Sequence, residues 1–397
     1  RALSSAASDV YKRQGPGRAG FGIEVGSMKK RNRRRRGRRP AGKLLRRAGL
    51  AGVILAGVFV LLGGVVTAGY FWLEARGRAS FEEKQEALPS EMEADAVSEN
   101  DSGSGLEDGM IRYNGKTYAY KQNCLTFLCM GIDKKGEMEA SEDLLEGGQA
   151  DAIFLAVLDP DEQKISVIGV NRDTMTEISV YDENGLYIGK RTAQIALQHG
   201  YGDGMEMSCE RMVEAVSHLF YGIPIHGYCS LNMEVITLLN DEIGGVTVTV
   251  PEDLTVRGTL KWEAGQQVHL LGEDAYTFVQ YRDTKTAQSA EGRLARQKQY
   301  LQAFITQAKA AMRENMTLPL SLYELVTPYM VTDISEEEAV YLAAQALAYS
   351  FRPEDIHTLE GEVVMGEKYG EFYQDDTALY ELILQVFYEE VESESES

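Results

Sequence analysis

Two short apolar runs on either side of a polar corner constrain the fold of this chain more than any other stretch. The runs are Ala152 to Leu158 and Ile165 to Val170, and residues 159–163 between them contain Asp, Pro and Glu. This pattern predicts two antiparallel strands joined by a turn. Both runs are apolar at nearly every position instead of alternating, which predicts strands in the middle of a sheet that is covered on both faces.

The predicted hairpin brings charged residues together at its open end. Asp151 precedes the first run, and Arg172 and Asp173 follow the second. Pairing of the two strands therefore places Asp151 beside Arg172 and Asp173. We call this open end of the hairpin, with Asp151, Arg172 and Asp173, the mouth. Its carboxylates and guanidinium could hold a metal ion and an anion.

A basic run and a long apolar stretch occupy the N-terminal part of the chain. Residues 29–47 contain 12 Lys or Arg and no acidic residue, and residues 48–73 are uncharged and mostly apolar. Twenty-six such residues are enough for a helix to cross the ~30 Å hydrocarbon core of a bilayer. The basic run could instead bind nucleic acid. Its position directly before the apolar stretch favours a membrane helix with a cytoplasmic N-terminus, and no cleavage site typical of a signal peptide follows.

Composition predicts the other boundaries. Residues 1–27 read as sequence upstream of a start at Met28, and residues 28–47 as a basic cytoplasmic segment. Residues 74–110 are rich in Glu, Ser, Gly and Asp and predict a flexible extracellular stalk. An extracellular domain at 111–390 and a disordered tail at 391–397 follow. After residue 78 the chain has 22 basic and 58 acidic residues, so this exterior part should repel nucleic acid.

The globular part mixes strands and helices, which predicts one α/β (mixed α+β) domain with a central mixed sheet flanked by helices. Further strands are expected at 125–130 and 246–250. Helical spacing is expected at 206–220, 231–239, 273–281, 293–313, 336–349 and 376–389.

Carboxylates form the first candidate site. Asp133 follows the strand at 125–130 and Asp151 precedes the next strand, so the two share one sheet edge if those strands are antiparallel. Two hard oxygen ligands that leave room for water and phosphate suit Mg²⁺. The alternative is that acids at strand ends are simply solvated, and these two residues alone favour that alternative.

Arginines form the second and third candidate sites. Arg172 offers a planar fork for phosphate oxygens, and Asp173 could orient that fork or accept a proton; a surface ion pair is the alternative. Arg282 precedes a predicted helix on which Arg293 and Gln297 share one face, with Arg296 bordering Arg293. Such a helical turn could bind an anion, or it could be a solvated face.

Other catalytic classes lack support in the sequence. The four cysteines show no CxxC spacing and are interpreted as small buried apolar residues. The five histidines are scattered and are interpreted as structural. Walker, GxGxxG and GxSxG motifs are absent from the sequence, so nothing indicates nucleotide binding or serine hydrolysis.

Several short motifs follow one another between Cys124 and Gln302, with a looser echo at Gly366 to Tyr373. They are Gly131-Ile132-Asp133, Asp151, Asn171-Arg172-Asp173-Thr174, Ile243-Gly244-Gly245-Val246, Leu271-Gly272-Glu273-Asp274-Ala275, Tyr281-Arg282 and Arg293 to Gln297. Their order and spacing, after a basic segment and a single membrane helix, resemble the LytR-CpsA-Psr family of cell-envelope-related transcriptional attenuator domains.

The resemblance implies a membrane-anchored phosphotransferase that moves a glycopolymer from a polyprenyl-pyrophosphate carrier to peptidoglycan, with Mg²⁺, outside the cell membrane. The polyprenyl tail of the carrier would need an apolar groove, for which the helices at 206–220 and 231–239 are candidates. Core packing explains the apolar residues of these helices equally well. The resemblance also implies roles for individual residues: Asp133 and Asp151 as metal ligands, Arg172, Arg282, Arg293 and Gln297 as substrate-binding residues, and Asp173 as an acid that orients Arg172 or assists proton removal. Arg296 is a further substrate-binding candidate because it borders Arg293 on the predicted helix.

Two positions depart from the family pattern. The family often has Arg where this chain has Gln149 and Gln280. Each lost charged hydrogen bond weakens anion binding by ~1.5–3 kcal/mol if nothing replaces it. Two other functions therefore stay open: a non-catalytic envelope regulator that binds lipid pyrophosphate, and a polyprenyl-pyrophosphate hydrolase.

Overall fold

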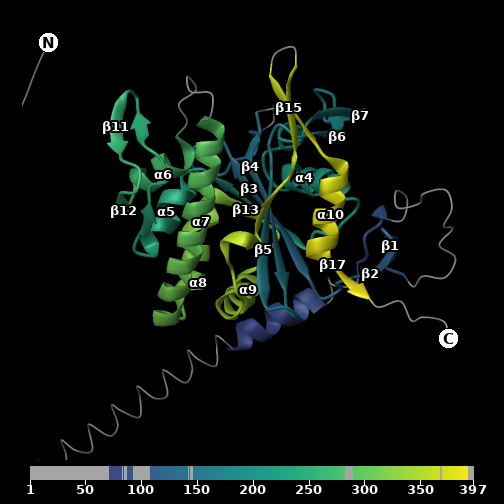
Figure 1. Cartoon of the computed structure of the whole chain (residues 1–397), viewed down its shortest axis with the longest axis horizontal. Coiled ribbons are helices and arrows are strands. Elements are labelled where there is room, and N and C mark those ends of the chain that lie inside the picture. Colours follow the sequence, from purple (N-terminus) through teal and green to yellow (C-terminus); the bar gives the residue numbers. More distant parts are fainter. Residues whose placement is uncertain are drawn as a thin grey trace, which may run out of the picture. The chain divides into compact units, whose positions relative to one another are not determined.

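A six-stranded sheet built around the predicted hairpin forms the centre of the domain (Figure 1). The computed structural model describes residues 71–82, 84, 87–92, 108–141, 143, 146–281, 289–366 and 369–391. All of these belong to one compact unit, Leu62–Ser397. The strands of the sheet are, in spatial order, β13 (Met330–Thr332), β8 (Gly227–Asn232), β3 (Leu125–Ile132), β4 (Ala150–Asp159), β5 (Lys164–Val170) and β14 (Ile356–Thr358).

The strand directions make this a mixed sheet, as predicted. β3, β4 and β5 are antiparallel neighbours, and β13 is antiparallel to β8. β8 runs parallel to β3, and β14 runs parallel to β5. The register of the central hairpin runs from Ile153 opposite Val170 to Asp159 opposite Lys164. The hairpin prediction is therefore confirmed, and both of its strands are interior strands.

Successive side chains of β4 point to opposite faces, and both faces are covered. Ile153, Leu155 and Val157 are buried with residues of α4 (Glu206–Leu219) and α10 (Asp376–Phe387). Phe154 and Ala156 pack with residues of α9 (Glu336–Ala348) on the other face. Burial on both faces explains why the two runs are continuously apolar.

Core packing accounts for the apolar residues of α4. Cys209, Met212, Val216 and Leu219 are at most 5% exposed, and all belong to the main buried cluster. All four cysteines of the chain are free thiols. Burial raises the pKa of the Cys209 thiol to about 12 and that of the Cys129 thiol to about 11. Both thiols therefore stay protonated at neutral pH and pack like small apolar side chains.

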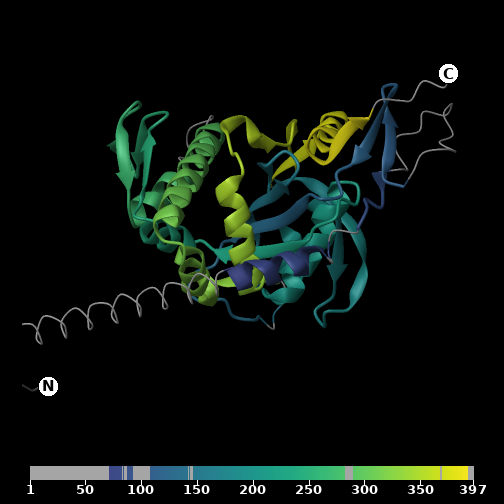
Figure 2. The same cartoon turned by 90° about the horizontal axis from the view of Figure 1, so that it is seen from below.

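A helix at residues 71–82 lies where the predicted stalk begins (Figure 2). Phe81 is 1% exposed, and its ring meets Phe127 edge-on at 5.5 Å. Gly77 permits a close approach to α9, because a Cβ atom there would lie 2.3 Å from the carbonyl oxygen of Glu337. Lys84 pairs with Glu338 at 3.0 Å. Residues 71–82 therefore pack on the domain. The buried ring of Phe81 is a main contact, and composition alone did not predict this packing.

Most of the predicted N-terminal segments lie outside the described residues. These are the leader at 1–27, the basic segment at 28–47 and all but the last three residues of the apolar stretch at 48–73. Most of the predicted tail at 391–397 lies outside them too. Within the part that the structure describes, no helix has the length and apolar character needed to cross a membrane.

A second buried cluster holds together the elements that lie between β8 and β13 along the chain. Val248, Leu270, Phe278 and Trp262 are among its members. Its elements are α5 (Val235–Glu242), β9 (Val246–Thr249), β10 (Leu254–Val256), β11 (Thr259–Trp262), β12 (Gln267–Leu270), α6 (Glu273–Gln280), α7 (Ser289–Glu314) and α8 (Leu318–Val326).

Three small sheets complete the domain. β1 (Met110–Tyr113), β2 (Lys116–Tyr120) and β17 (Tyr388–Val391) form one of them, in which β17 is antiparallel to β2. The other two are hairpins, β6 (Met175–Tyr181) with β7 (Tyr187–Gln194), and β15 (Gly361–Met365) with β16 (Gly370–Gln374). The remaining short elements are α3 (Leu197–Gly200), η1 (Thr327–Tyr329) and η2 (Pro353–Asp355).

The predicted helices at 206–220, 273–281, 293–313 and 336–349 are confirmed to within a few residues. The helix predicted at 231–239 is partly wrong, because Leu231 and Asn232 end β8 and α5 begins only at Val235. The helix predicted at 376–389 ends at Phe387, and Tyr388 begins β17. In both places strand pairing with a distant segment overrides the local helical pattern.

Candidate active site

The open end of the β4–β5 hairpin gathers the charged residues that the sequence placed there. The Arg172 guanidinium donates to Asp151 Oδ1 and, at 2.6 Å, to Gln149 Oε1. Its Nε atom lies 3.6 Å from Asp173 Oδ1. The side chains of Arg172, Asp151 and Asp173 are 31%, 23% and 41% exposed, so solvent and a ligand can reach all three.

Asp133 lies at the same edge of the sheet. β3 and β4 are antiparallel, with Gly131 opposite Ala152 and Ile132 opposite Ala150. The register shift between Gly131 and Ile132 marks an irregularity in the ladder just before Asp133. The Asp133 backbone N–H donates to the Gln149 carbonyl oxygen at 3.4 Å. The structure therefore brings together the two carboxylates that we expected to share an edge.

The surroundings of Asp151 disfavour its charged form. Burial raises the pKa of Asp151, and the negative charge of Asp133 raises it further, although Arg172 and Arg293 oppose the shift. The net shift is upward despite the direct bond to Arg172. A bound cation would relieve the repulsion between the two carboxylates.

The donor set fits Mg²⁺ bound together with a phosphate. Among the described residues no group of three or more His, Cys, Asp or Glu is arranged to hold a metal ion. Asp133 and Asp151 therefore supply two carboxylates only. Mg²⁺ commonly takes one or two protein carboxylates and fills its other positions with water and phosphate oxygens.

Asp173 is held by a residue that sequence analysis did not identify. Gln194, the last residue of β7, donates from Nε2 to Asp173 Oδ1 at 3.1 Å and to the Gly370 carbonyl oxygen at 2.8 Å. The Phe372 backbone N–H donates to the Asp173 carbonyl oxygen at 2.9 Å. The β15–β16 hairpin thus fixes the position of Asp173. Gln194 and Asp173 are 21 residues apart, and Gln194 and Gly370 are 176 residues apart, so no local motif signals these contacts.

The two glutamines that depart from the family pattern have partners in the mouth region. Gln149 accepts a hydrogen bond from Arg172, which an arginine at that position could not do. Gln280 hydrogen-bonds the side chain of Tyr276, a residue that sequence analysis missed. Burial raises the pKa of the Tyr276 hydroxyl, and the nearby charge of Asp133 adds to the shift. Tyr276 therefore lies within electrostatic reach of the carboxylates.

The predicted residues on α7 do not all face the mouth. The positive charge of Arg293 acts on Asp151. Arg296 is 2% exposed and donates instead to the carbonyl oxygens of Phe278 and Tyr281 and, at 2.9 Å, to Glu252 Oε1. The described contacts of Arg296 thus join α7 to α6 and to the loop after β9.

The other two predicted substrate residues add little to the geometry. Gln297 Nε2 donates to the Val279 carbonyl oxygen at 3.4 Å, which directs the amide toward α6. Arg282 lies outside the described residues.

Comparison with known proteins gives one family. The model of the LytR_cpsA_psr family matches residues 76–383. Two similar curated proteins are both named polyisoprenyl-teichoic acid–peptidoglycan teichoic acid transferase TagU. The Bacillus mycoides protein is 29% identical over 186 residues, which is 47% of this chain and 53% of that protein. The Bacillus cereus protein is 26% identical over 219 residues, 55% of this chain and 63% of that protein. The chain thus spans between half and two thirds of these relatives.

Solved structures share the fold. The crystal structure of B. subtilis TagV superposes with a TM-score of 0.51 at 23% identity, over 66% of this chain and 95% of that one. Protein gbs0355 from Streptococcus agalactiae superposes with a TM-score of 0.52 at 20% identity, over 66% of this chain and 86% of that one.

Proposed function

Because the chain belongs to the LytR-CpsA-Psr family, we propose that it transfers a glycopolymer from a polyprenyl-pyrophosphate carrier onto peptidoglycan during cell-wall assembly. The observation that carries this proposal is the mouth of the β4–β5 hairpin, where Arg172 bonds to Asp151 beside Asp133. The relatives named as teichoic acid transferases to peptidoglycan support the reaction class. The predicted membrane helix at 48–73 would hold the domain at the outer face of the membrane, where the lipid carrier is exposed.

The guanidinium of Arg172 suits a pyrophosphate because it is oriented before the substrate arrives. Gln149 and Asp151 both accept hydrogen bonds from it, which fixes its plane. A preoriented cation stabilises charge that develops on phosphate oxygens without reorganising during the reaction. Arg293 would add a second positive charge from α7. Asp133 and Asp151 would hold Mg²⁺, which when bound neutralises phosphate oxygens and polarises the phosphorus.

In this proposal, Asp173 accepts the proton of the attacking hydroxyl. In the proposed reaction the acceptor oxygen forms a bond to the phosphorus that carries the glycopolymer. The bond from that phosphorus to the bridging oxygen breaks in line, and polyprenyl phosphate leaves with the electron pair. Gln194 donates to the Asp173 carboxylate and so holds it in position while the proton is transferred.

The decisive variant is Arg172→Ala. We expect Mg²⁺-dependent transfer of a lipid-pyrophosphate-linked glycopolymer to peptidoglycan to fall at least roughly 10²-fold, because the oriented charge is lost. Arg352→Ala is the matched control, since Arg352 is 58% exposed and its ion pairs within the described part of the chain are with Glu354 and Asp355. Circular dichroism would check that both variants fold. Unchanged transfer by Arg172→Ala would overturn the proposal.

The two glutamines support a second set of candidates. With Gln149 and Gln280 where the family often has arginine, the grip on a pyrophosphate rests on fewer guanidiniums. A non-catalytic carrier-binding protein would bind lipid pyrophosphate and transfer nothing to any acceptor. A hydrolase would release phosphate without an acceptor. Measurement of binding, phosphate release and transfer on the same preparation separates the three functions.

A further inference from the structure

A pocket of about 480 Å³ opens between the β1–β2 hairpin, α10 and β17, on elements that contribute no residue to the mouth. We propose that this pocket binds an uncharged saccharide, and that the saccharide is the glycan backbone of the peptidoglycan acceptor; the second part rests on the proposed function. The lining combines three tyrosines with amide and charged groups: Tyr113, Tyr118, Tyr388, Asn114, Lys116, Glu381, Leu384 and Gln385.

The tyrosine rings are fixed before any ligand arrives. Tyr113 packs on Tyr380 with ring centroids 5.0 Å apart, and its hydroxyl donates to Glu381 Oε1 at 3.2 Å. Tyr388 is 4% exposed and packs against Tyr120 at 5.5 Å. A sugar ring presents a face of C–H groups that packs on an aromatic ring, and a preordered ring loses little entropy when it binds. The pocket thus offers rigid apolar walls for sugar faces.

Polar groups at the rim match sugar hydroxyl and acetamido groups. Asn114 and Gly115 both have positive φ, 48° and 79°, as the two central residues of a tight hairpin turn require. The turn holds the Asn114 amide at the rim of the pocket. Gln385 lies one helical turn after Glu381 on α10. Amides donate and accept at once, and carboxylates accept, which is what a ligand rich in hydroxyls needs.

The charges of the pocket disfavour an anionic polymer. Lys116 is the one cation among the lining residues, and it pairs with Glu390 at 2.7 Å. Glu381 adds a negative charge to the lining, and the chain after residue 78 is strongly acidic. A phosphate-rich donor polymer would be repelled from this surface. The uncharged amino-sugar backbone of peptidoglycan would not, so the pocket fits the acceptor and not the donor.

The binding test uses chitotetraose, an uncharged amino-sugar oligomer, titrated into the full chain in detergent by calorimetry. We expect saturable binding that Tyr113→Ala weakens at least tenfold and Gln385→Ala weakens severalfold. Tyr187→Ala is the control, because Tyr187 is a 55% exposed tyrosine on β7 that packs edge-on against Tyr181. Gln385 is exposed on α10, so its variant serves even if Tyr113→Ala does not fold.

Two results of this titration would overturn the proposal. One is chitotetraose binding that is absent or equal in wild type, Tyr113→Ala and Gln385→Ala. The other is poly(glycerol phosphate) that binds in place of chitotetraose and is lost in the same variants, which would assign the pocket to the donor.

Kinetics separate this proposal from the proposed function. We expect Tyr113→Ala to raise KM for peptidoglycan about tenfold and to leave kcat and Mg²⁺-dependent turnover with a short acceptor unchanged, because the pocket holds the acceptor away from the reacting phosphorus. Chitotetraose binding that depends on Tyr113 in a protein without transferase activity would retain the pocket and overturn the function. Transfer with an unchanged KM and no saccharide binding would do the reverse.

Discussion

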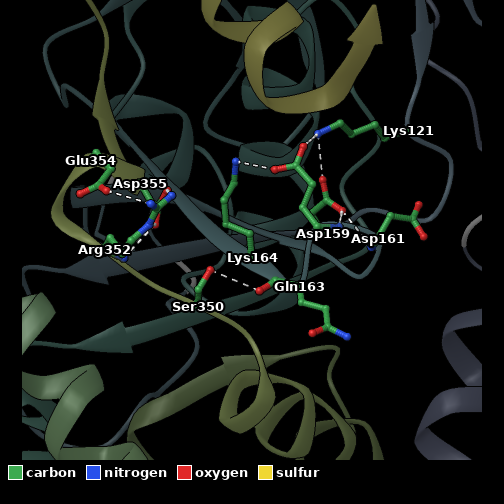
Figure 3. A network of polar contacts seen from close by, with 10 residues as sticks. Lys121, Asp159, Asp161, Gln163, Lys164, Ser350, Arg352, Glu354 and Asp355 are labelled. Atoms are coloured by element: carbon green, nitrogen blue, oxygen red, sulfur yellow. Dashed lines mark hydrogen bonds and ion pairs between the residues drawn. The ribbon is translucent and has the colours of Figure 1, made fainter.

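The two ends of the β4–β5 hairpin both carry acidic and basic side chains, and they differ in how those charges are balanced. At the turn end, Lys121 lies 2.8 Å from Asp159 and 2.6 Å from Glu162, and Lys164 lies 2.9 Å from Glu162 (Figure 3). Asp159 Oδ1 also accepts from the backbone N–H groups of Asp161 and Glu162. Each carboxylate in this network has several donors.

At the open end, the described contacts of the Arg172 guanidinium join three acceptors. Arg172 faces Asp151, Gln149 and Asp173, and Asp133 lies nearby. The pKa shifts record the difference. Hydrogen bonds from Lys121 and Lys164 lower the pKa of Glu162 to about 2, whereas burial and Asp133 raise that of Asp151. Ion pairs occur at both ends, so it is the upward pKa shift of a partly buried carboxylate that distinguishes the open end as a candidate site for a cation and a phosphate.

The largest expected effect comes from removing one charge at the open end. Asp151→Asn should lower Mg²⁺-dependent transfer roughly 10²-fold or more, because a metal carboxylate is lost. The free energy of unfolding should stay within ~1 kcal/mol or rise, since a partly buried charge is removed. The control is Asp161→Asn at the turn, where the Asp161 side chain accepts a hydrogen bond from Asn123 at 3.2 Å. Equal activity in the two variants would remove the contrast between the ends.

The opposite experiment removes a charge at the turn end. Lys121→Met should lower the free energy of unfolding by ~3 kcal/mol, because Asp159 is 5% exposed and loses its cation. Transfer per folded molecule should not change. Lys164→Met removes a cation that pairs with the half-exposed Glu162, and it should lower the free energy by less than ~1 kcal/mol. Urea unfolding of both variants measures the difference, and equal losses would contradict the role of burial.

Acid should disturb the open end first. Burial, together with the charge of Asp133, raises the pKa of Asp151 above its ordinary value of 3.8. As pH falls, Asp151 should therefore take up a proton, and Mg²⁺-dependent transfer should be lost, before pH 3.8 is reached. Within that window the folded state binds the extra proton, so this group makes the protein less stable as pH rises.

Glu162 behaves with the opposite sign. Its folded pKa of about 2 lies below the ordinary value of 4.5, so its stabilising contribution is complete above pH 4.5 and is lost as pH falls through about 2. A pH–rate profile together with carboxyl chemical shifts from NMR would test the order. Titration of Glu162 before Asp151 would contradict it.

The smallest effect concerns Gln194. Gln194→Leu should lower kcat about threefold to tenfold and shift the acid limb of the pH–rate profile, because Asp173 loses a donor that holds and stabilises its carboxylate. Gln194→Glu should be worse, since it places a second carboxylate beside Asp173. Gln374→Leu, on the β15–β16 hairpin that Gln194 contacts, is the control. An unchanged pH–rate profile in Gln194→Leu would contradict a role of Gln194 in stabilising the Asp173 carboxylate.

The sequence predicted those parts of the site that neighbouring strands bring together. Asp151, Arg172 and Asp133 lie at the ends of three strands that follow one another along the chain and pair antiparallel, so the apolar runs of the strands were enough to place them. Gln194 and Tyr276 could not be found in this way. Each reaches the mouth through the packing of a separate element, β7 or α6, and neither belongs to a local motif.

Prediction failed where the same local signal serves two purposes. Arg293 and Arg296 look alike in sequence, but they point in different directions from α7 because they are three residues apart. The charge of Arg293 acts on Asp151, whereas Arg296 is buried against Phe278 and Glu252. Phe81 and the strand at Tyr388 were missed for a related reason. Their partners are about 50 and 270 residues away along the chain, and local composition carries no record of them.

The pairing of β17 with β2 has a consequence for how the protein is made. Tyr388 pairs with Tyr120 and Val391 with Thr117. A ribosome that synthesises from the N-terminus releases β2 long before β17 exists, so one edge of β2 stays open throughout that interval. An open edge is prone to join other strands and to be cut by proteases. This edge of β2 is covered only once β17, which ends at Val391, has been synthesised and has paired with it. A chain that stops before β17 would therefore keep the edge exposed.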